Sequence, residues 1–171
     1  AIITERDNLS WDNQQGTIVA QHELRIGKLL LKSSPINHID TADLINTICQ
    51  ATAKHGLSMF NWNDSSVLQL QQRVAKVAEW HPELSLPDIS TQHLISSAHE
   101  WLPFYLNNNG HILTNINELK KIDIKQAIWN IIPYELQLII DRLAPSHIQV
   151  PTGSSISIDY GRASEHPVLS V

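Results

Sequence analysis

Two short groups of basic side chains are the residues in this sequence whose types and spacing best suit contact with a ligand. Lysine ammonium and arginine guanidinium groups bind phosphate, so both groups are candidate contacts to a nucleic-acid backbone. The alternative is ordinary solvated surface, which short groups of this kind form in many proteins. The first group comprises Arg25, Lys28 and Lys32, and the second comprises Lys120, Lys121 and Lys125, which lie close enough in sequence to form one patch.

The overall charge limits this interpretation. The 171 residues include 12 lysines and arginines against 17 aspartates and glutamates, which gives a formal net charge of −5, and there is no basic run. A chain of this sign repels phosphate as a whole. Any nucleic-acid contact must therefore come from a local patch.

Metal and nucleophile chemistry have little support in the sequence. None of the nine histidines has another at the i, i+4 spacing that places two imidazoles on one helix face for zinc. His93 and His99 with Glu100 come nearest, but their spacing puts the two rings on different faces. The single cysteine, Cys49, falls on the apolar face of a predicted helix. We therefore expect a buried structural thiol and a reducing compartment, with the cytoplasm as the default.

Nucleotide hydrolysis is excluded for the residues present. The six glycines stand singly, and neither GxxxxGK[ST] nor GxGxxG occurs, so no loop can cradle a phosphate. We expect no catalytic residue, no cofactor site and no metal site in this chain. The five tryptophans fall mostly on predicted helix faces or ends, which favours core packing over base stacking. The longest apolar runs are too short to span a membrane.

The N-terminal elements that would position the first basic group are predicted to be strands. Turn-forming residues 11–16 precede a long β-rich stretch over 17–31, in which Gly27 marks a bulge or bend. If no bulge intervenes, side-chain alternation places the two lysines of the first group on one side of this strand and the arginine on the other. A linker begins at Ser33. This sheet opens without a partner beyond its own hairpin, so we expect the chain to be a segment of a longer protein.

Helical signals fill the middle of the chain. Asp40 and Asp64 are suited to cap helices, Gly56 to end one, and Pro103 to kink or restart another. Helices are predicted to begin at about residues 41, 65, 90, 124 and 133. Their apolar stripes are expected to form one core in which Leu44, Ile48, Leu70, Val74, Leu94, Ala98 and Trp101 bury one another.

The last helix is followed by signals for an antiparallel β-meander. Pro151-Thr152-Gly153 predicts a hairpin corner, with Gly153 at positive φ. The predicted fold class is α+β, with N-terminal β-hairpin strands, a central helical bundle, and C-terminal helices leading into the meander. The segments are 1–36, 37–110 and 111–171, and the meander strands are Ser146–Val150, Ser155–Tyr160 and Pro167–Val171.

A series of short motifs, in order along nearly the whole chain, resembles one family. They are Trp11-Asp12, Val19-Ala20, Leu24-x-x-Gly27, Glu100–Leu106, Ile132–Gln137, Asp141–His147, Val150–Ser154, Ile158–Tyr160 and Pro167–Val171. Together they resemble the C-terminal region of HrpB-type bacterial ATP-dependent helicases, which are DEAH-box-like superfamily 2 proteins.

The resemblance implies an accessory, non-catalytic region of a helicase that supports the motor or positions RNA or DNA. Residues 1–36 would be the end of an OB-like or connector portion. The motor domains of the same parent chain would be a partner, and ATP and Mg²⁺ would act there. In this family the hairpin after Gly153-Ser154 often carries basic residues, whereas this sequence has Ser155 and Ser157, which weakens a nucleic-acid role for that hairpin. An alternative stays open, a protein-interaction module that docks a partner through its acidic helical surface. The net charge favours this alternative, and the resemblance favours the helicase.

Overall fold

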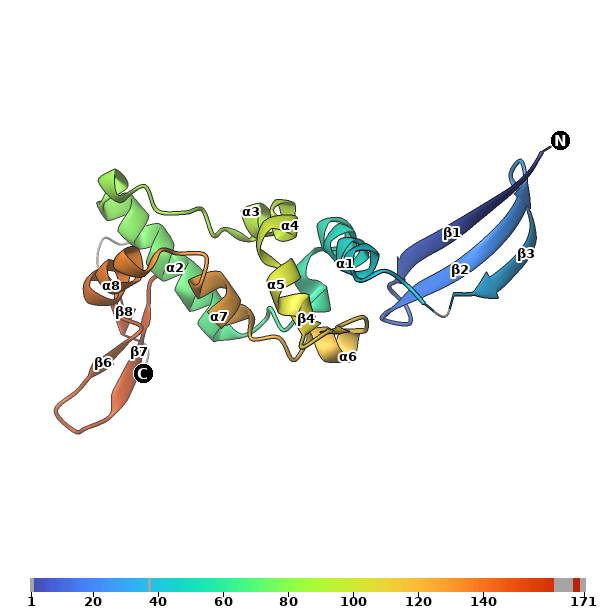
Figure 1. Ribbon diagram of the computed structural model, residues 1–171. Helices are drawn as coiled ribbons and strands as arrows, with labels where there is room; N and C mark the ends of the chain where they lie inside the picture. The colour runs from blue at the N-terminus through green and yellow to red at the C-terminus, as the bar shows by residue number, and fades with distance from the viewer. Residues whose placement is uncertain (1, 37, 162–167, 170–171) are drawn as a thin grey trace. The chain divides into compact units, whose positions relative to one another are not determined.

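The structure is a computed structural model that describes residues 2–36, 38–161 and 168–169, and its fold is α+β, as the sequence predicts (Figure 1). Its contacts divide the chain into two compact units. Unit 1 comprises Ala1–Asn61 and Ile95–Ile122, and unit 2 comprises Trp62–Leu94 and Asp123–Val171. The boundaries of these units differ from those of the expected segments 1–36, 37–110 and 111–171. The units are defined by contacts and the segments by sequence pattern, so the division into three segments stays a prediction. Among the described residues, no helix is both long enough and apolar enough to cross a bilayer.

Unit 1 begins with a three-stranded antiparallel sheet in the order β1-β2-β3. β1 (Ile3–Asp12) pairs with β2 (Thr17–Ile26) along their whole length, and the predicted turn joins them. β3 (Leu29–Pro35) then runs back along β2.

The chain reverses at Gly27 and Lys28, so the expected single strand over 17–31 is wrong. Gly27 has a φ of 56°, in the left-handed region that glycine reaches without a Cβ penalty, and this allows a two-residue hairpin turn. The pairing of β2 with β3 also shifts register between Leu24 and Arg25. The expected linker is shorter than predicted, because β3 continues to Pro35.

One long helix packs on this sheet. α1 (Thr41–His55) begins behind Asp40, whose side chain accepts a hydrogen bond from Ala42 N, and it ends at Gly56, as predicted. It packs against β1 and against two short helices of the same unit, α4 and α5. The remaining elements of unit 1 are η1 (Gly56–Met59), α4 (Ala98–Trp101), α5 (Pro103–Leu106), β4 (Asn107–Asn108), β5 (His111–Ile112) and α6 (Ile116–Leu119).

The third predicted helix is broken into three pieces, α3 (Thr91–Ser96), α4 and α5. Pro103 begins α5, as expected for a restart, because proline has no N–H to continue the preceding helix. The chain after α5 forms a short hairpin of β4 and β5 that was not predicted. Its turn residues Asn109 and Gly110 have φ values of 52° and 90°, which suit a two-residue hairpin turn.

Unit 1 is closed by a contact between parts distant in sequence. Ile116 N donates to Gly16 O at 2.7 Å, and Ile18 N donates to Thr114 O at 3.1 Å. A Cβ on Gly16 would lie 2.6 Å from Ile116 Cγ2, and Gly16 has a φ of 65°. Both the space and the backbone conformation therefore require glycine where the β1–β2 turn meets α6.

Unit 2 is built on α2 (Ser65–Trp80), which Asp64 caps as predicted. α2 packs against α7 and α8 and joins the C-terminal meander through Gln69, whose Nε2 donates to Ser146 O at 2.6 Å and to Ile158 O at 3.0 Å. The other elements are η2 (Pro82–Leu84), α7 (Ile124–Trp129), α8 (Tyr134–Leu143), β6 (His147–Gln149), β7 (Ser155–Asp159) and β8 (Val168–Leu169).

The meander β6-β7-β8 is antiparallel, as predicted, and Gly153 has a φ of 85° at its first corner. Pro167, Ser170 and Val171 of the expected last strand lie outside the described residues. The expected single helical core needs correction, because its residues are divided between the two units. Ile48, Ala98 and Trp101 are buried in unit 1, and Leu70, Val74 and Leu94 are buried in unit 2, while Leu44 is half-buried.

Candidate nucleic-acid interface

Arg25, on β2, is hydrogen-bonded to other residues of the sheet. Its Nε donates to Glu23 Oε2 at 2.9 Å, and its Nη1 donates to the carbonyl oxygen of Lys28. Glu23 is only 5% exposed, and Arg6 Nε lies 3.9 Å from the same carboxylate oxygen. The hydrogen bond from Arg25 lowers the pKa of Glu23 below its usual value, with the charges of both arginines adding to the effect. These two arginines and one carboxylate form a local cluster with a formal charge of +1.

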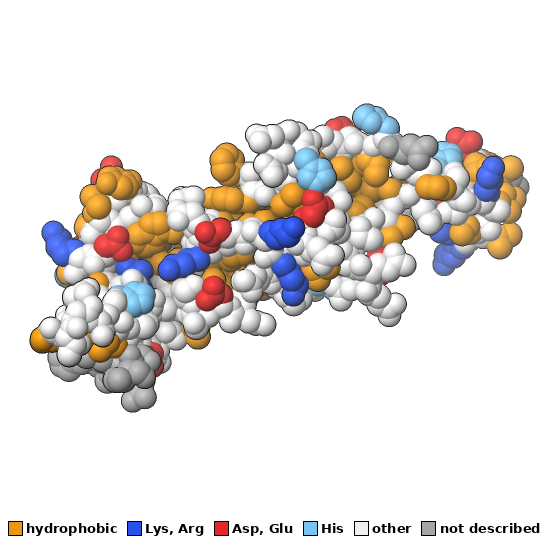
Figure 2. All heavy atoms as spheres, turned by 90° about the horizontal axis from the view of Figure 1, so that it is seen from below, with side chains coloured by type: hydrophobic (Ala, Val, Ile, Leu, Met, Phe, Trp, Pro, Cys, Tyr) orange, Lys and Arg blue, Asp and Glu red, His pale blue; other side chains and the backbone are white. Residues whose placement is uncertain are grey.

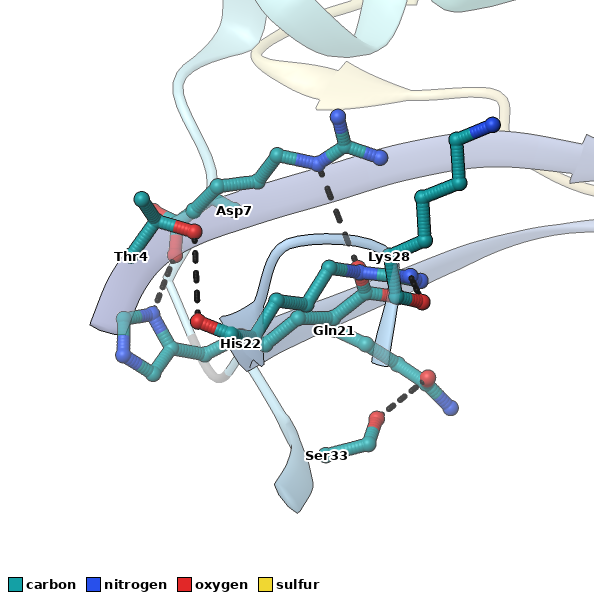
Figure 3. Close-up of polar contacts among 9 residues, drawn as sticks. Thr4, Asp7, Gln21, His22, Lys28 and Ser33 are labelled. Carbon is teal, nitrogen blue, oxygen red and sulfur yellow. Dashed lines mark hydrogen bonds and ion pairs between the residues drawn. The ribbon is translucent and has the colours of Figure 1, made fainter. Parts of the chain in front are cut away.

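Lys28 and Lys32 are the exposed cations of the first group. Lys28 lies in the β2–β3 turn, and Figure 3 shows its side chain extending away from the bonded residues of the sheet. Lys32 lies on β3 opposite Leu24, the neighbour of Arg25 on β2. Because adjacent strand residues point to opposite faces, Lys32 and Arg25 are on different faces, although the prediction assumed one strand without a bulge and the pairing here shifts register. Lys28 cannot share a strand face with Lys32, since the strand is broken at Lys28.

Polar side chains also pair across the strands of the sheet, and one end of the sheet is apolar. His22 Nδ1 lies 2.6 Å from Asp7 Oδ1, and Gln21 accepts a hydrogen bond from Ser33 (Figure 3). At the other end, large apolar side chains are exposed. They are Ile2, Ile3, Leu29, Leu30 and Leu31.

Lys120 and Lys121 lie at the end of α6 in unit 1. Asn115 caps this helix through a hydrogen bond from Glu118 N, and Lys120 is exposed at its C-terminal end. Lys121 lines a groove of about 480 Å³, here called the α5–α6 groove. The groove is lined by Phe104, Tyr105, Asn107, Asn108, His111, Leu113, Glu118, Lys121 and Ile122.

Glu118, the acidic side chain in the α5–α6 groove, is hydrogen-bonded to neighbouring residues. Glu118 accepts hydrogen bonds from His111 Nε2 at 2.5 Å, from the amide of Asn115 at 2.7 Å and from Thr114 N. The His111 hydrogen bond is the largest cause that lowers the pKa of Glu118, and the charge of Lys121 adds to it. Glu118 therefore remains ionised and fixed, and it holds the hairpin of β4 and β5 on α6.

Lys125 belongs to unit 2, so the expected patch of three lysines is divided between the units. It is half-buried on α7 and lines a pocket of about 360 Å³ with Arg73, Trp129, Gln126 and the carboxylates Asp123 and Asp141. Its charge also helps to lower the pKa of Asp64, after the hydrogen bonds from Ser66. Lys125 thus lies among carboxylates of its own unit.

Arg73 is a buried cation that the sequence reasoning missed. Its Nε donates to Ala144 O, its Nη2 donates to Asp141 Oδ1 at 2.7 Å, and its guanidinium lies 5.6 Å from the centre of the Trp129 ring. The signal was present in the sequence, because Arg73 falls among Leu70, Val74 and Val77 on the apolar stripe of α2. A charged residue in such a stripe implies buried partners.

The negative charge of the chain is unevenly distributed between the units. Unit 1 has seven lysines and arginines against eight aspartates and glutamates, whereas unit 2 has five against nine. Unit 1 is therefore close to neutral, and unit 2 carries most of the net charge of −5. Figure 2 shows the basic side chains on one face in small groups interspersed with acidic ones. Five of the six predicted cations lie on the nearly neutral unit, the exception being Lys125.

The described residues offer no metal centre and no reactive thiol. Among residues 2–36, 38–161 and 168–169, no group of three or more histidine, cysteine or acidic side chains could hold a metal ion. Cys49 is buried, as predicted, and burial raises the pKa of its thiol to about 11. A protonated, buried thiol is a poor nucleophile.

Comparison with known proteins adds two family matches. Residues 2–36 match the family described as the connector region of the ATP-dependent RNA helicase HrpB. Residues 101–171 match the family described as the ATP-dependent helicase C-terminal region.

Individual relatives agree with these matches. The chain is 30% identical over 170 residues to the ATP-dependent RNA helicase HrpB of Escherichia coli strain K12, a match that covers 99% of this chain and 20% of that protein. A crystal structure described as E. coli DExH-box NTPase HrpB superposes with a TM-score of 0.71 at 31% identity, over 99% of this chain and 20% of that one. Another, described as E. coli DEAH/RHA helicase HrpB, gives 0.72 at 30% identity, over 100% and 21%. The chain thus spans about a fifth of the length of the relatives it matches.

Proposed function

Because the chain belongs to the HrpB family of helicases, whose connector and C-terminal regions it carries, we propose that it is an accessory, non-catalytic region that positions single-stranded RNA or DNA for an ATP-dependent motor. The motor domains of the same parent protein are its proposed partner. ATP and Mg²⁺ are proposed to act in those domains, and the cytoplasm is the proposed location.

The observation that carries the nucleic-acid role is the distribution of charge. Unit 1 is nearly neutral and bears Lys28, Lys32, Lys120 and Lys121 as exposed cations, so phosphate can approach it without the repulsion that the whole chain implies. The net charge therefore does not oppose a local contact on unit 1. It opposes one on unit 2, where Lys125 stands among carboxylates.

Charge reversal tests this proposal. Binding of a fluorescent single-stranded oligonucleotide to the 171-residue chain is measured by anisotropy at several salt concentrations. We expect a Kd of roughly 10⁻⁴ M or weaker near physiological salt, as for nonspecific phosphate contact, and tighter binding at low salt.

Two double variants and one single variant separate the contributions of the lysines to binding. Lys120→Glu with Lys121→Glu should weaken binding and flatten its salt dependence, by about 0.7 in the slope of log K against log salt for each lost phosphate contact. Lys28→Glu with Lys32→Glu tests the sheet in the same way, and Lys125→Glu on unit 2 is the control that should leave binding unchanged. No binding by the wild-type chain even at low salt would refute a nucleic-acid role for this region.

A further inference from the structure

The α5–α6 groove contains an aromatic side chain that the fold does not use. Phe104 is 81% exposed, although its neighbours Leu102 and Leu106 on the same turn are fully buried. Its ring meets Tyr105 edge-to-face with 5.2 Å between the centroids, so an aromatic neighbour fixes one side of it. The large exposed fraction leaves a ring face open to the groove and to solvent.

The other lining residues of the groove are mostly polar. Asn107 uses its side-chain oxygen to accept a hydrogen bond from Gly110 N at 2.9 Å. Within the described part of the chain, neither the amide nitrogen of Asn107 nor the side chain of Asn108 forms a hydrogen bond. A fully apolar occupant would leave these amides unpaired, which is costly. The occupant that fits must offer both a flat apolar face and polar edges.

The cations of the groove favour an anionic backbone on that occupant. Lys121 lines the groove and exposed Lys120 precedes it, while the carboxylate of Glu118 is held by His111, Thr114 and Asn115. A planar face, amide groups and lysines together are the chemistry that single-stranded nucleic acids require, because their bases stack on aromatic rings while their phosphates meet cations.

The walls of the groove are held in place by the fold. Leu113 N donates to Leu106 O at 2.9 Å, and the hairpin of β4 and β5 continues directly from α5. Glu118 joins that hairpin to α6. The volume of about 480 Å³ lies within the range of roughly 300–1,000 Å³ that is typical of small-ligand sites.

We propose that the α5–α6 groove holds one unpaired base of a single-stranded nucleic acid, stacked on Phe104, with the adjoining phosphates on Lys120 and Lys121. This inference rests on the proposed function and adds a defined subsite to it. A base paired within a duplex cannot present its face to the ring, so the site selects single strands.

The test uses the 171-residue chain and a single-stranded oligonucleotide at low salt, in RNA and DNA forms. Phe104→Ala should weaken binding by roughly 5- to 150-fold, the effect of losing one stacked base, while the salt slope stays unchanged because no charge is removed. Phe104→Trp should retain binding. An oligonucleotide of the same length with abasic sites should bind wild type and Phe104→Ala equally.

A fluorescent base analogue gives a second readout. A strand that carries 2-aminopurine should change its fluorescence on binding to the wild-type chain, since stacking alters the emission of this base, and should not do so with Phe104→Ala. Because Phe104 is 81% exposed, the variant should unfold at the same urea concentration as wild type, which separates loss of stacking from loss of fold.

The outcomes distinguish the two proposals. If the wild-type chain binds no single strand at low salt, the proposed function fails and this subsite fails with it. If the chain binds, and reversal of Lys120 and Lys121 weakens binding but Phe104→Ala does not, the subsite is refuted and the proposed function stands. In that case a protein would be the remaining candidate for contact with the exposed ring of Phe104. Equal affinity for a blunt duplex and a single strand would also refute the stacking site.

Discussion

The Nε of Arg73 donates to the carbonyl oxygen of Ala144 across 2.6 Å, and this bond joins the middle of α2 to the C-terminal end of α8. Arg73 is 5% exposed and Ala144 is fully buried, so the carbonyl depends on a protein donor. Trp129 and Asp141 hold the rest of the guanidinium. A cation in the core of unit 2 thereby links three of its helices.

Arg73→Met should destabilise the chain by about 1–3 kcal/mol, because methionine fills much of the space but leaves the Ala144 carbonyl without a donor. Asp141→Asn should cost less than about 1 kcal/mol, since its side chain is 60% exposed and solvent already screens the ion pair. Urea unfolding of the variants measures both costs. Equal costs would show that the ion pair, and not the bond to the carbonyl, is the stabilising contact.

Leu70→Ala should cost about 2–5 kcal/mol, because Leu70 is 1% exposed in the core of unit 2 and its removal leaves a cavity. Leu68, two residues earlier on the same helix, is 55% exposed and is the matched control. Leu68→Ala should change stability by less than about 0.5 kcal/mol. Denaturant titration of the two variants tests which face of α2 is buried, and a loss at Leu70 below that limit would mean the assignment is wrong.

Gly16→Ala should destabilise unit 1 more than Gly27→Ala. Both glycines have positive φ, so alanine is strained at either position, by an amount on the order of 1 kcal/mol. Only at Gly16 would the new Cβ meet a side chain, Ile116, whereas nothing lies within 4 Å of it at Gly27. The difference between the two unfolding free energies measures the contact, and a difference near zero would mean that Ile116 moves aside without cost.

Glu118→Gln should alter the acid branch of the stability curve. Hydrogen bonds in the folded state, first that from His111, lower the pKa of Glu118 below the ordinary value of 4.5. Such a carboxylate contributes its full stabilisation above the unfolded pKa and loses it as the pH falls through the lower folded pKa. Wild type should therefore lose stability more steeply than Glu118→Gln below about pH 4.5. Urea titrations at several pH values compare the two, and parallel curves would contradict the assignment.

The chain should not bind ATP, because its sequence lacks a loop of backbone amides and a lysine that could hold the phosphates. Titration of a fluorescent ATP analogue should give no saturable signal. Saturation in the micromolar range, which corresponds to about −8 kcal/mol, would show a nucleotide site that the sequence analysis excludes.

The elements that local chemistry determines were predictable from the sequence. Asp40, Asp64 and Gly56 placed the ends of α1 and α2, because caps act within a few residues of themselves. The C-terminal meander followed from Gly153 and alternation for the same reason. The hairpin of β4 and β5 could also have been recognised, since Asn109-Gly110 is a common two-residue turn.

The grouping of the cations could not be predicted, because it depends on contacts between residues far apart in the chain. Lys121 and Lys125 are four residues apart, but they belong to different units. Unit 2 resumes at Asp123, which caps α7, and Lys125 lies on α7. Likewise, nothing local indicates that Arg6 on β1 would lie beside Glu23 on β2, or that Phe104 would face a groove closed by His111 and Glu118. Spacing along the sequence shows which residues are close only within one element.

The bond between Gly16 and Ile116 also sets an order of events during synthesis. The β1–β2 hairpin leaves the ribosome early, but the helix that receives its turn is made about a hundred residues later. At roughly 5–20 residues per second, the finished hairpin waits on the order of 5–20 s for that helix. During this interval the carbonyl oxygen of Gly16 lacks its donor from α6 and unit 1 cannot close, so a nascent chain is more open to chaperones before Ile116 emerges than after it.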